Sequence, residues 1–310
     1  MKKILSALLM LLMLSSVLFG CSSGETSADP APQSPQPAEG ALVSYLGPAG
    51  TYTEEAARFF FNGSQKFFPE ATVPDAIAAV ISGKSDYAVI PQENTLGGAV
   101  TGYVDALIAE NDIYVVGEVI LPISQTLMGV SGSTLEDIKV VVSHAQGIVQ
   151  SCEWREKNLP DAETLEMSST AAAANYVAEK GDRTIAAVAS PGAAELYSLT
   201  VLAENVQITD SNKTRFYVLA KERLEDSGFK NAVFVATCGA DRLDDIIIEI
   251  HNAGLELVSL HDRPEGSGLG SYYYIIEAEN ASGINQKQIE KIESISEIRC
   301  LGSFDVFEKK

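Results

Sequence analysis

The sequence predicts an α/β protein made of a larger sheet-and-helix part followed by a smaller βαββαβ unit. Between residues 42 and 222, short apolar runs rich in β-branched residues alternate with stretches whose apolar residues recur every three or four positions. Such alternation is typical of a mostly parallel sheet covered by helices. From residue 231 the order becomes strand, helix, two strands, helix, strand, which is the ferredoxin-like arrangement.

Six runs in the larger part have the composition of strands: 42–47, 86–91, 114–122, 139–144, 184–190 and 214–220. Five stretches between them have the spacing of amphipathic or alanine-rich helices: 53–61, 75–83, 98–111, 147–158 and 170–181. In the smaller unit we expect four strands and two helices. The strands are 231–239, 255–262, 271–279 and 297–306, and the helices are 242–254 and 285–296.

The N-terminal residues have the pattern of an export signal. Two lysines precede an apolar run over 4–19, and small residues and Cys21 follow it. This resembles a bacterial lipobox, in which the cysteine is diacylated and becomes the new N-terminus; the alternative is an ordinary cleaved signal with an incidental cysteine. We expect a signal peptide over 1–20 and a lipidated Cys21. A disordered tether over 21–41 would then hold the protein outside the cytoplasm on the bacterial membrane.

The chain is acidic, with 42 Asp and Glu residues against 22 Lys and Arg residues and a formal net charge of −20. Such a surface does not suit nucleic acid, and it leaves the lipid as the only expected contact with a membrane. A carboxylate substrate would need a local cationic pocket. Only three histidines are present, and the cysteines after Cys21 match no metal-binding spacing, so we expect no metal site.

Polar residues follow two of the predicted strands. The first strand runs into GPAGTYT, where Thr51 or Thr53 can cap the next helix and free backbone N–H groups can bind a carboxylate. The alternative is a plain glycine-rich turn. Asn94 and Thr95 follow the strand that ends near Pro91, at the edge where α/β sheets bind ligands, although a simple polar loop would look the same.

Two further motifs follow the same logic. Ser143 ends a β-branched strand, and Gln146 and Gln150 are four residues apart, so they share a helix face. The adjacent Ser-His pair is not a hydrolase dyad, because neighbouring side chains diverge. Finally, Thr214-Arg215-Phe216 opens a strand after a polar segment, which places a hydroxyl and a guanidinium at a strand mouth.

Taken together, GPAGTYTEEAA, the PQENT segment, SHAQ with a Gln four residues later, and the Thr-Arg-Phe run resemble the prephenate dehydratase family in order and spacing. Ala145 stands where that family has proline. The resemblance implies a two-lobed, periplasmic-binding-protein-like catalytic domain over 42–222. One lobe would contain 42–118 and 214–222, the other 121–205, and the ligand would lie between them. It also implies conversion of prephenate to phenylpyruvate, water and carbon dioxide in phenylalanine biosynthesis, without a cofactor.

The resemblance further implies roles for individual residues. Thr214 would assist departure of the ring hydroxyl, and Asn94, Ser143 and Gln150 would position the ring as further catalytic residues. Substrate-binding residues would be Arg215, Phe216, Thr51, Thr53, Thr95 and Gln146. Arg215 and the backbone N–H groups near Thr51 and Thr53 would bind carboxylate.

Residues 231–308 resemble an ACT regulatory domain, which in this family pairs across a dimer and binds phenylalanine. The corresponding positions here are Gly239, Asp262, Arg263 and Pro264. Asp262 replaces a serine, and its carboxylate would weaken binding of an amino acid carboxylate. We expect a homodimer or homotetramer.

The sequence is compatible with two other functions. A solute-binding lipoprotein for a small carboxylate or amino acid could keep the two-lobed cleft without catalysis. Retention of Asn94, Ser143, Gln150 and Thr214 favours the enzyme, because binding alone would not need the full set. An amino acid sensor working through the C-terminal unit is disfavoured by the altered residues there.

Overall fold

The computed structural model describes residues 39–62, 65–225, 228–266 and 269–310. The predicted signal segment 1–20, Cys21 and nearly all of the predicted tether lie outside the described residues. No helix in the described part has the length and apolar character needed to cross a membrane.

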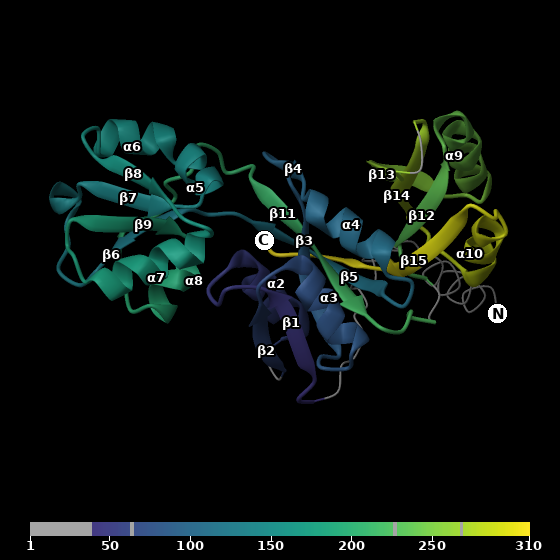
Figure 1. Ribbon diagram of the computed structural model, residues 1–310, viewed down its shortest axis with the longest axis horizontal. Helices are drawn as coiled ribbons and strands as arrows, with labels where there is room; N and C mark the ends of the chain where they lie inside the picture. Colours follow the sequence, from purple (N-terminus) through teal and green to yellow (C-terminus); the bar gives the residue numbers. More distant parts are fainter. Residues whose placement is uncertain (1–38, 63–64, 226–227, 267–268) are drawn as a thin grey trace, which may run out of the picture. The chain divides into compact units, whose positions relative to one another are not determined.

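The first sheet contains the strands that carry the N-terminal motifs, and its order is β16-β5-β11-β3-β1-β2, with β4 paired to β3 (Figure 1). Its strands are β1 (Leu42–Leu46), β2 (Lys66–Glu70), β3 (Tyr87–Asn94), β4 (Gly98–Ala99), β5 (Tyr114–Pro122), β11 (Lys213–Ala220) and β16 (Val306–Glu308). The chain leaves this sheet after β5 and returns to it as β11. These two strands are therefore antiparallel neighbours.

Helices cover both faces of the first sheet. They are α2 (Tyr52–Phe61), α3 (Val73–Ile81) and α4 (Thr101–Ala109). Side chains alternate between faces along a strand, so Phe216 packs in the same cluster as Phe60 of α2, whereas Tyr217 packs with Ile77 and Leu107 of α3 and α4. This alternation decides which residues of β11 can reach the candidate site.

The second sheet has the order β10-β6-β9-β7-β8. Its strands are β6 (Thr126–Gly129), β7 (Val140–Ser143), β8 (Glu163–Glu166), β9 (Ile185–Ala189) and β10 (Thr200–Ala203). Figure 1 shows two pairs of helices on opposite sides of this sheet: α5 (Ala145–Gln150) with α6 (Cys152–Asn158), and α7 (Thr170–Lys180) with α8 (Pro191–Leu196). A one-turn helix, η1 (Leu135–Asp137), precedes β7.

The C-terminal unit has the predicted βαββαβ order, with η2 (Ala240–Arg242) leading into the first helix. Its elements are β12 (Asn231–Gly239), α9 (Leu243–Asn252), β13 (Glu256–Pro264), β14 (Ser271–Glu279), α10 (Gln286–Glu293) and β15 (Ile298–Phe304). This third sheet has the order β13-β14-β12-β15 and is antiparallel throughout, as in ferredoxin-like folds. Both helices cover one face. Apolar residues of the other face, including Val235 and Ile275, join the cluster that contains Leu107 of α4.

The predicted α/β class and the ferredoxin-like unit are confirmed, but the expectation of a mostly parallel first part is wrong. In the first sheet β11 is antiparallel to both β3 and β5, and in the second sheet β6 is antiparallel to β9 and β10. Both sheets are therefore mixed. The chain crosses from the first sheet to the second after β5 and crosses back before β11. The returning strand β11 therefore runs in the opposite direction to β5.

Several short elements were not predicted, and three of the missed strands, β6, β8 and β10, have four residues each. The predicted helix 147–158 is two helices that meet at Ser151, whose Oγ donates to the carbonyl of Gly147 at 2.7 Å. The predicted strand 297–306 ends earlier, and the chain continues into β16, which pairs in parallel with β5 of the first sheet. Residues 231–308 thus contribute a strand to the first sheet.

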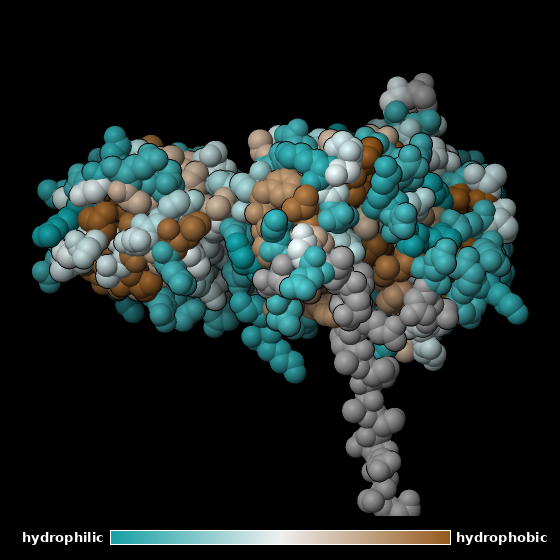
Figure 2. All heavy atoms as spheres, turned by 90° about the horizontal axis from the view of Figure 1, so that it is seen from below, coloured by the Kyte–Doolittle hydropathy of each residue, from teal (hydrophilic) through white to brown (hydrophobic). Residues whose placement is uncertain are grey.

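The surface is mainly hydrophilic where Figure 2 shows it. On the face shown in Figure 2, hydrophilic side chains predominate and apolar ones form separate smaller patches. One glycine is required where the third sheet approaches the first sheet closely. Gly302 of β15 has φ 147°, and a Cβ there would collide with the backbone carbonyl of Val115 in β5. A larger residue would force the third sheet away from the first.

Candidate active site

The candidate site forms where β3 and β11 lie side by side in the first sheet. Their antiparallel register places Thr214 opposite Asn94. The register shifts between Arg215 and Phe216, which leaves Gln92 as an extra residue on β3. A bulge of this kind bends the strand and redirects its side chains. Because Asn94 and Thr214 are paired directly across the two strands, their side chains share a face and meet at the end of the paired region.

Hydrogen bonds fix the orientation of the Asn94 amide. Its Oδ1 accepts from the backbone N–H groups of Leu96 and Gly97, both at 3.0 Å. The Nδ2 must therefore face the other way, and it donates to Thr214 Oγ1 at 2.9 Å and to Asn212 Oδ1 at 2.9 Å. Because Thr214 Oγ1 accepts this bond, its own proton remains for another acceptor. Among the described residues, that proton has none.

A cavity of about 310 Å³ lies against Asn94 and Thr214. Its walls come from the ends of β1, β3 and β11, from the segment between β5 and β6, and from the starts of helices on both sheets. The lining residues are Leu46, Gly47, Thr51, Tyr52, Thr53, Ala71, Asn94, Ile123, Gln125, His144, Gln146, Gly147, Gln150, Ser168, Ser169, Thr170 and Thr214.

This cavity is polar but carries no fixed charge: none of the described residues that line it is Lys, Arg, Asp or Glu. This cavity therefore lacks the local cationic pocket that a carboxylate substrate was expected to need. Hydroxyls, side-chain amides, one imidazole and backbone N–H groups provide the polar groups instead. Such groups can bind an anion when several of them converge.

Three helices, α2, α5 and α7, begin at the cavity wall, and the two longer ones are α2 and α7. The N-cap residues are Thr51 for α2 and Ser169 for α7, and each accepts a hydrogen bond from the backbone of its own first turn. The N-terminus of a helix carries free N–H groups and a partial positive charge, which favour anions. In α2 this effect is offset by Glu54 and Glu55 in the first turn. In α7 the first turn has no acidic residue, so its N-terminus is the stronger anion site.

Six of the residues predicted from the sequence line this cavity: Asn94, Thr214, Gln150, Thr51, Thr53 and Gln146. The glutamines project from α5, and Oε1 of Gln150 accepts a hydrogen bond from Nε2 of Gln125 at 2.9 Å. Gln125 and Ser169 were not predicted. Gln125 follows the end of β5, much as Asn94 stands at the end of β3. Ser169 precedes an alanine-rich helix in the pattern of an N-cap. The sequence pattern at both positions could therefore have pointed to them.

Arg215 does not reach the cavity, so the prediction that it binds a substrate carboxylate is wrong. It follows Thr214 on β11 and therefore points to the opposite face of the sheet. There its guanidinium makes two bonds of 2.7 Å to Glu118, one of 2.7 Å to Glu277, and one of 3.2 Å to Glu93. A guanidinium held by three carboxylates is not free for a substrate.

These groups form a buried polar network between β11 and the third sheet. Glu277 of β14 accepts hydrogen bonds from Gln92 and Tyr217 of the first sheet, and from Ser259 at 2.8 Å. Burial opposes the charge of Arg215, but its bonds to Glu118 and the nearby Glu277 outweigh burial and raise its pKa. Burial also raises the pKa of the Tyr217 hydroxyl, which therefore remains a donor. Ion pairs and buried hydrogen bonds therefore hold in place the face of β11 that points away from the cavity.

Three other predicted residues lie outside the cavity lining. Ser143 is 0% exposed, and its Oγ donates to the carbonyl of Val188 at 2.7 Å. It therefore supports the second sheet beneath α5 rather than positioning a ligand. Phe216 is buried in the apolar cluster against α2. The hydroxyl of Thr95 donates to the carbonyl of Ser211 at 3.3 Å.

The residues predicted for regulation lie on two strands of the third sheet: Gly239, Asp262, Arg263 and Pro264. The ends of β12 and β13 are brought to one edge, because Gly239 pairs with Ser271 and Pro264 pairs with Tyr272 of the same strand, β14. Arg263 bonds to Asp105 of α4, with Nε 2.5 Å from Oδ1. It therefore connects the third sheet to α4.

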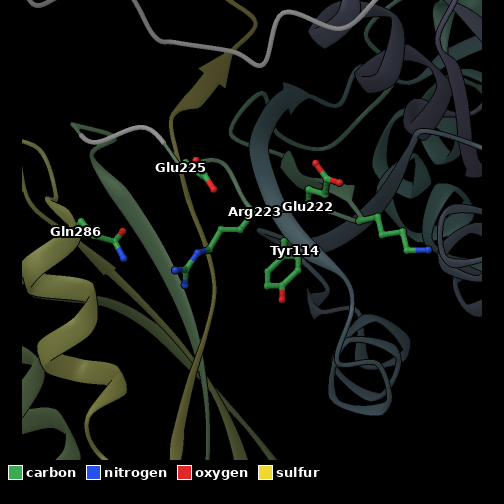
Figure 3. A pocket seen from close by; sticks show the side chains of 6 residues that line it. Tyr114, Glu222, Arg223, Glu225 and Gln286 are labelled. Carbon is green, nitrogen blue, oxygen red and sulfur yellow. The ribbon is translucent and has the colours of Figure 1, made fainter.

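A separate hollow of about 630 Å³ lies near the end of β11, and Figure 3 shows it. Charged and polar side chains line it: Tyr114, Lys221, Glu222, Arg223, Glu225 and Gln286. In Figure 3, Arg223 points toward α10, and it pairs with Glu293 of that helix at 3.2 Å. The basic and acidic side chains of this hollow balance one another, and none of the predicted site residues lines it. We therefore place the candidate site in the cavity of about 310 Å³ beside Asn94 and Thr214.

The described residues contain no cluster of three or more His, Cys, Asp or Glu side chains that could hold a metal ion. The cysteines at 152, 238 and 300 are free thiols. Burial raises the pKa of the Cys300 thiol to about 11, so it stays protonated at neutral pH.

Comparison with known proteins extends these observations. Residues 43–224 match the family described as prephenate dehydratase. The chain is 32% identical over 275 residues to the prephenate dehydratase of Lactococcus lactis subsp. cremoris, covering 86% of this chain and 98% of that protein. It is 33% identical over 269 residues to the bifunctional chorismate mutase/prephenate dehydratase of Aquifex aeolicus, covering 84% of this chain and 73% of that protein.

A solved structure agrees with these sequence matches. Prephenate dehydratase from Arthrobacter aurescens, in complex with L-Phe, superposes with a TM-score of 0.76 at 28% identity, covering 85% of this chain and 90% of that one.

The position of Arg215 generates a prediction about stability. Arg215→Met would leave Glu118 and Glu277 buried without their cation, so we expect the free energy of unfolding to fall by about 3–5 kcal/mol at neutral pH. The loss should shrink as the pH is lowered, because burial raises the pKa of Glu118 and the unpaired carboxyl takes up a proton. Urea unfolding across a pH series measures both effects.

Arg58→Met is the matched control. Arg58 pairs with Glu54 on the surface and its side chain is 57% exposed, so its loss should cost less than about 1 kcal/mol. Equal costs for the two variants would contradict a buried charge network around Arg215.

Proposed function

Because the chain belongs to the prephenate dehydratase family, we propose that the cavity beside Asn94 and Thr214 is where this lyase converts prephenate to phenylpyruvate. In that reaction the bond from the ring to its carboxylate breaks and releases carbon dioxide. The electron pair of that bond enters the ring, the ring becomes aromatic, and the ring hydroxyl departs as water after gaining a proton. The enzyme must hold the substrate, assist the departing oxygen and tolerate loss of the carboxylate.

The observation that carries the proposal is the hydrogen bond from Asn94 to Thr214. Asn94 uses its Nδ2 as a donor, so the Thr214 hydroxyl is left as a donor toward the cavity. A fixed donor stabilises negative charge that develops on a departing hydroxyl. A threonine hydroxyl is a weak acid, so we assign Thr214 the role of hydrogen-bonding the leaving oxygen rather than transferring a full proton.

The absence of fixed charge among the described lining residues suits a substrate that loses a carboxylate. A strong cation beside the departing carboxylate would stabilise the substrate more than the transition state, in which that charge is moving into the ring, and would slow the reaction. The side-chain carboxylate of prephenate keeps its charge throughout. We assign it to the N-terminus of α7, near Ser169 and Thr170, with donors from Gln146 and Gln150.

Substitution of Thr214 tests this proposal. Thr214→Val keeps the shape but removes the hydroxyl, so we expect turnover of prephenate to fall by about 100-fold or more, as when one preorganised donor is removed elsewhere. Thr214→Ser keeps a hydroxyl and should retain most of the activity. Phenylpyruvate formation by the purified protein provides the readout, and near-normal turnover by Thr214→Val would exclude Thr214 from the reaction.

We extend the proposal to the location of the enzyme. The signal pattern before Cys21 supports export and lipidation, which would anchor the enzyme outside the cytoplasm. In a bacterial host that processes lipoproteins, the protein should fractionate with membranes and carry acyl chains on Cys21, detectable by mass spectrometry. Cys21→Ser should release it from the membrane fraction. Membrane association that survives in Cys21→Ser would contradict the lipid anchor.

We also propose that the third sheet and its helices form an ACT-type regulatory domain that binds phenylalanine and pairs with a second copy in a homodimer or homotetramer. The βαββαβ order supports this assignment, as does the L-Phe complex of the Arthrobacter relative. Asp262 places a carboxylate near the expected ligand position, so Asp262→Ser should bind phenylalanine more tightly in calorimetry. Weaker binding by that variant would place the ligand elsewhere.

A further inference from the structure

Gln125 is a buried amide in the wall of the candidate active site. It lies in the short segment between β5 and β6, the residue is only 2% exposed, and it lines the cavity together with Gln150. Its Nε2 donates to Gln150 Oε1 at 2.9 Å. Its own Oε1 is buried without a partner among the described residues, which makes this side chain costly for stability alone.

The environment of the pair determines which way both amides face. In the observed orientation, the group without a partner is a carbonyl oxygen. If both amides were reversed, the group without a partner would be an NH2 bearing two N–H bonds. Buried N–H groups without partners are rarer than buried carbonyls without partners, so the observed orientation is favoured. Gln125 is therefore the donor and Gln150 the acceptor.

This orientation determines what Gln150 presents to a ligand. Its Oε1 is occupied by Gln125, so its Nε2 is the free end of the amide. No acceptor for that Nε2 occurs among the described residues. A substrate with two carboxylates is rich in acceptors, and the cavity has no cation to bind them. Each neutral donor therefore has to be held in the correct orientation.

The backbone around Gln125 is fixed well enough to set this orientation. Its N–H donates to Gln207 Oε1 at 2.9 Å, and its carbonyl accepts from the N–H of Val206 at 2.9 Å. The carbonyl of Gln150 accepts from the N–H of Ile208 at 2.7 Å. Residues 125 and 150 are thus tied to the same returning segment, 206–208, which connects the second sheet back to β11.

We propose that Gln125 is a positioning residue that holds the amide of Gln150 with its Nε2 directed to the substrate. This inference rests on the proposed function of the cavity. It assigns to Gln125 no contact with the reacting atoms, only control over which end of Gln150 the substrate meets.

The substitution Gln125→Glu tests the role directly. An ionised carboxylate can only accept hydrogen bonds, so it should turn the Gln150 amide and present Oε1, an acceptor, to an acceptor-rich substrate. Burial raises the pKa of a carboxyl, so the measurement runs over a pH series that extends into the alkaline range. Where the carboxyl is ionised, we expect kcat/KM for prephenate to fall by about 100-fold relative to wild type, since an essential donor is replaced by repulsion. As the pH is lowered, the glutamic acid gains a proton and can donate again. The activity relative to wild type should then recover.

Two other variants make the result interpretable. Gln125→Met fills similar space without a donor, so it should lower kcat/KM by about tenfold with no recovery at low pH. Gln286→Glu makes the same chemical change on α10 and should leave the activity unchanged. Taking each activity as a ratio to wild type at the same pH removes the contribution of His144, the histidine in the cavity wall.

Thermal unfolding shows whether each variant is folded, and Gln125→Met provides the test if Gln125→Glu does not fold. Normal kcat/KM in folded Gln125→Met, or a low-pH ratio that does not recover in folded Gln125→Glu, would overturn the role of Gln125 while leaving the dehydratase activity in place. A wild-type protein that does not convert prephenate would overturn both.

Discussion

The antiparallel pairing of β11 with β3 is the constraint on which the rest of the structure depends. It brings Thr214 opposite Asn94, although 119 residues lie between them in the chain. The backbone N–H groups of Leu96 and Gly97 then fix the direction of the Asn94 amide, whose Nδ2 donates to Thr214 and leaves the Thr214 proton free. The second sheet is inserted between β5 and β11, so the same pairing also brings its helices to the cavity.

The two faces of β11 have separate tasks. The face with Thr214 borders a cavity lined by neutral polar groups, where helix N-termini and amides replace side-chain cations. The opposite face carries Arg215 and Tyr217, which bond to Glu277 of the third sheet. A change in the third sheet that moved Glu277 would act on the residue next to Thr214, so the buried charge network offers a physical route by which a ligand on the C-terminal unit could influence the site.

Much of this arrangement could be predicted from the sequence. Strands such as 114–122, 231–239 and 271–279 were bounded correctly, because β-branched and aromatic residues cluster there. Asn94, Gln150 and Thr214 were found because polar residues at strand ends and on one helix face are visible in a single sequence. Four-residue strands such as 163–166 were not predicted; this one is exposed throughout and carries no apolar alternation.

The errors have physical causes. The family resemblance assigned Arg215 to a substrate carboxylate, but strand alternation sends it to the face opposite Thr214. Its partner Glu277 is brought there only by tertiary packing. Ser143 ends the expected strand, yet its hydroxyl is consumed by a neighbouring backbone carbonyl. Gln125 was missed although its place just after a predicted strand is visible in the sequence, because the hydrogen bond to Gln150 that gives it a role forms only in the folded protein.

The measurement that tests the central claim most directly is a double-mutant cycle on kcat/KM for prephenate with Asn94→Ala, Thr214→Val and the double variant. If Asn94 acts by orienting the Thr214 hydroxyl, its loss should matter little once that hydroxyl is gone. The two effects should then be non-additive by about 1–3 kcal/mol. Additivity within about 0.5 kcal/mol would show that the two residues act independently, and would contradict the account.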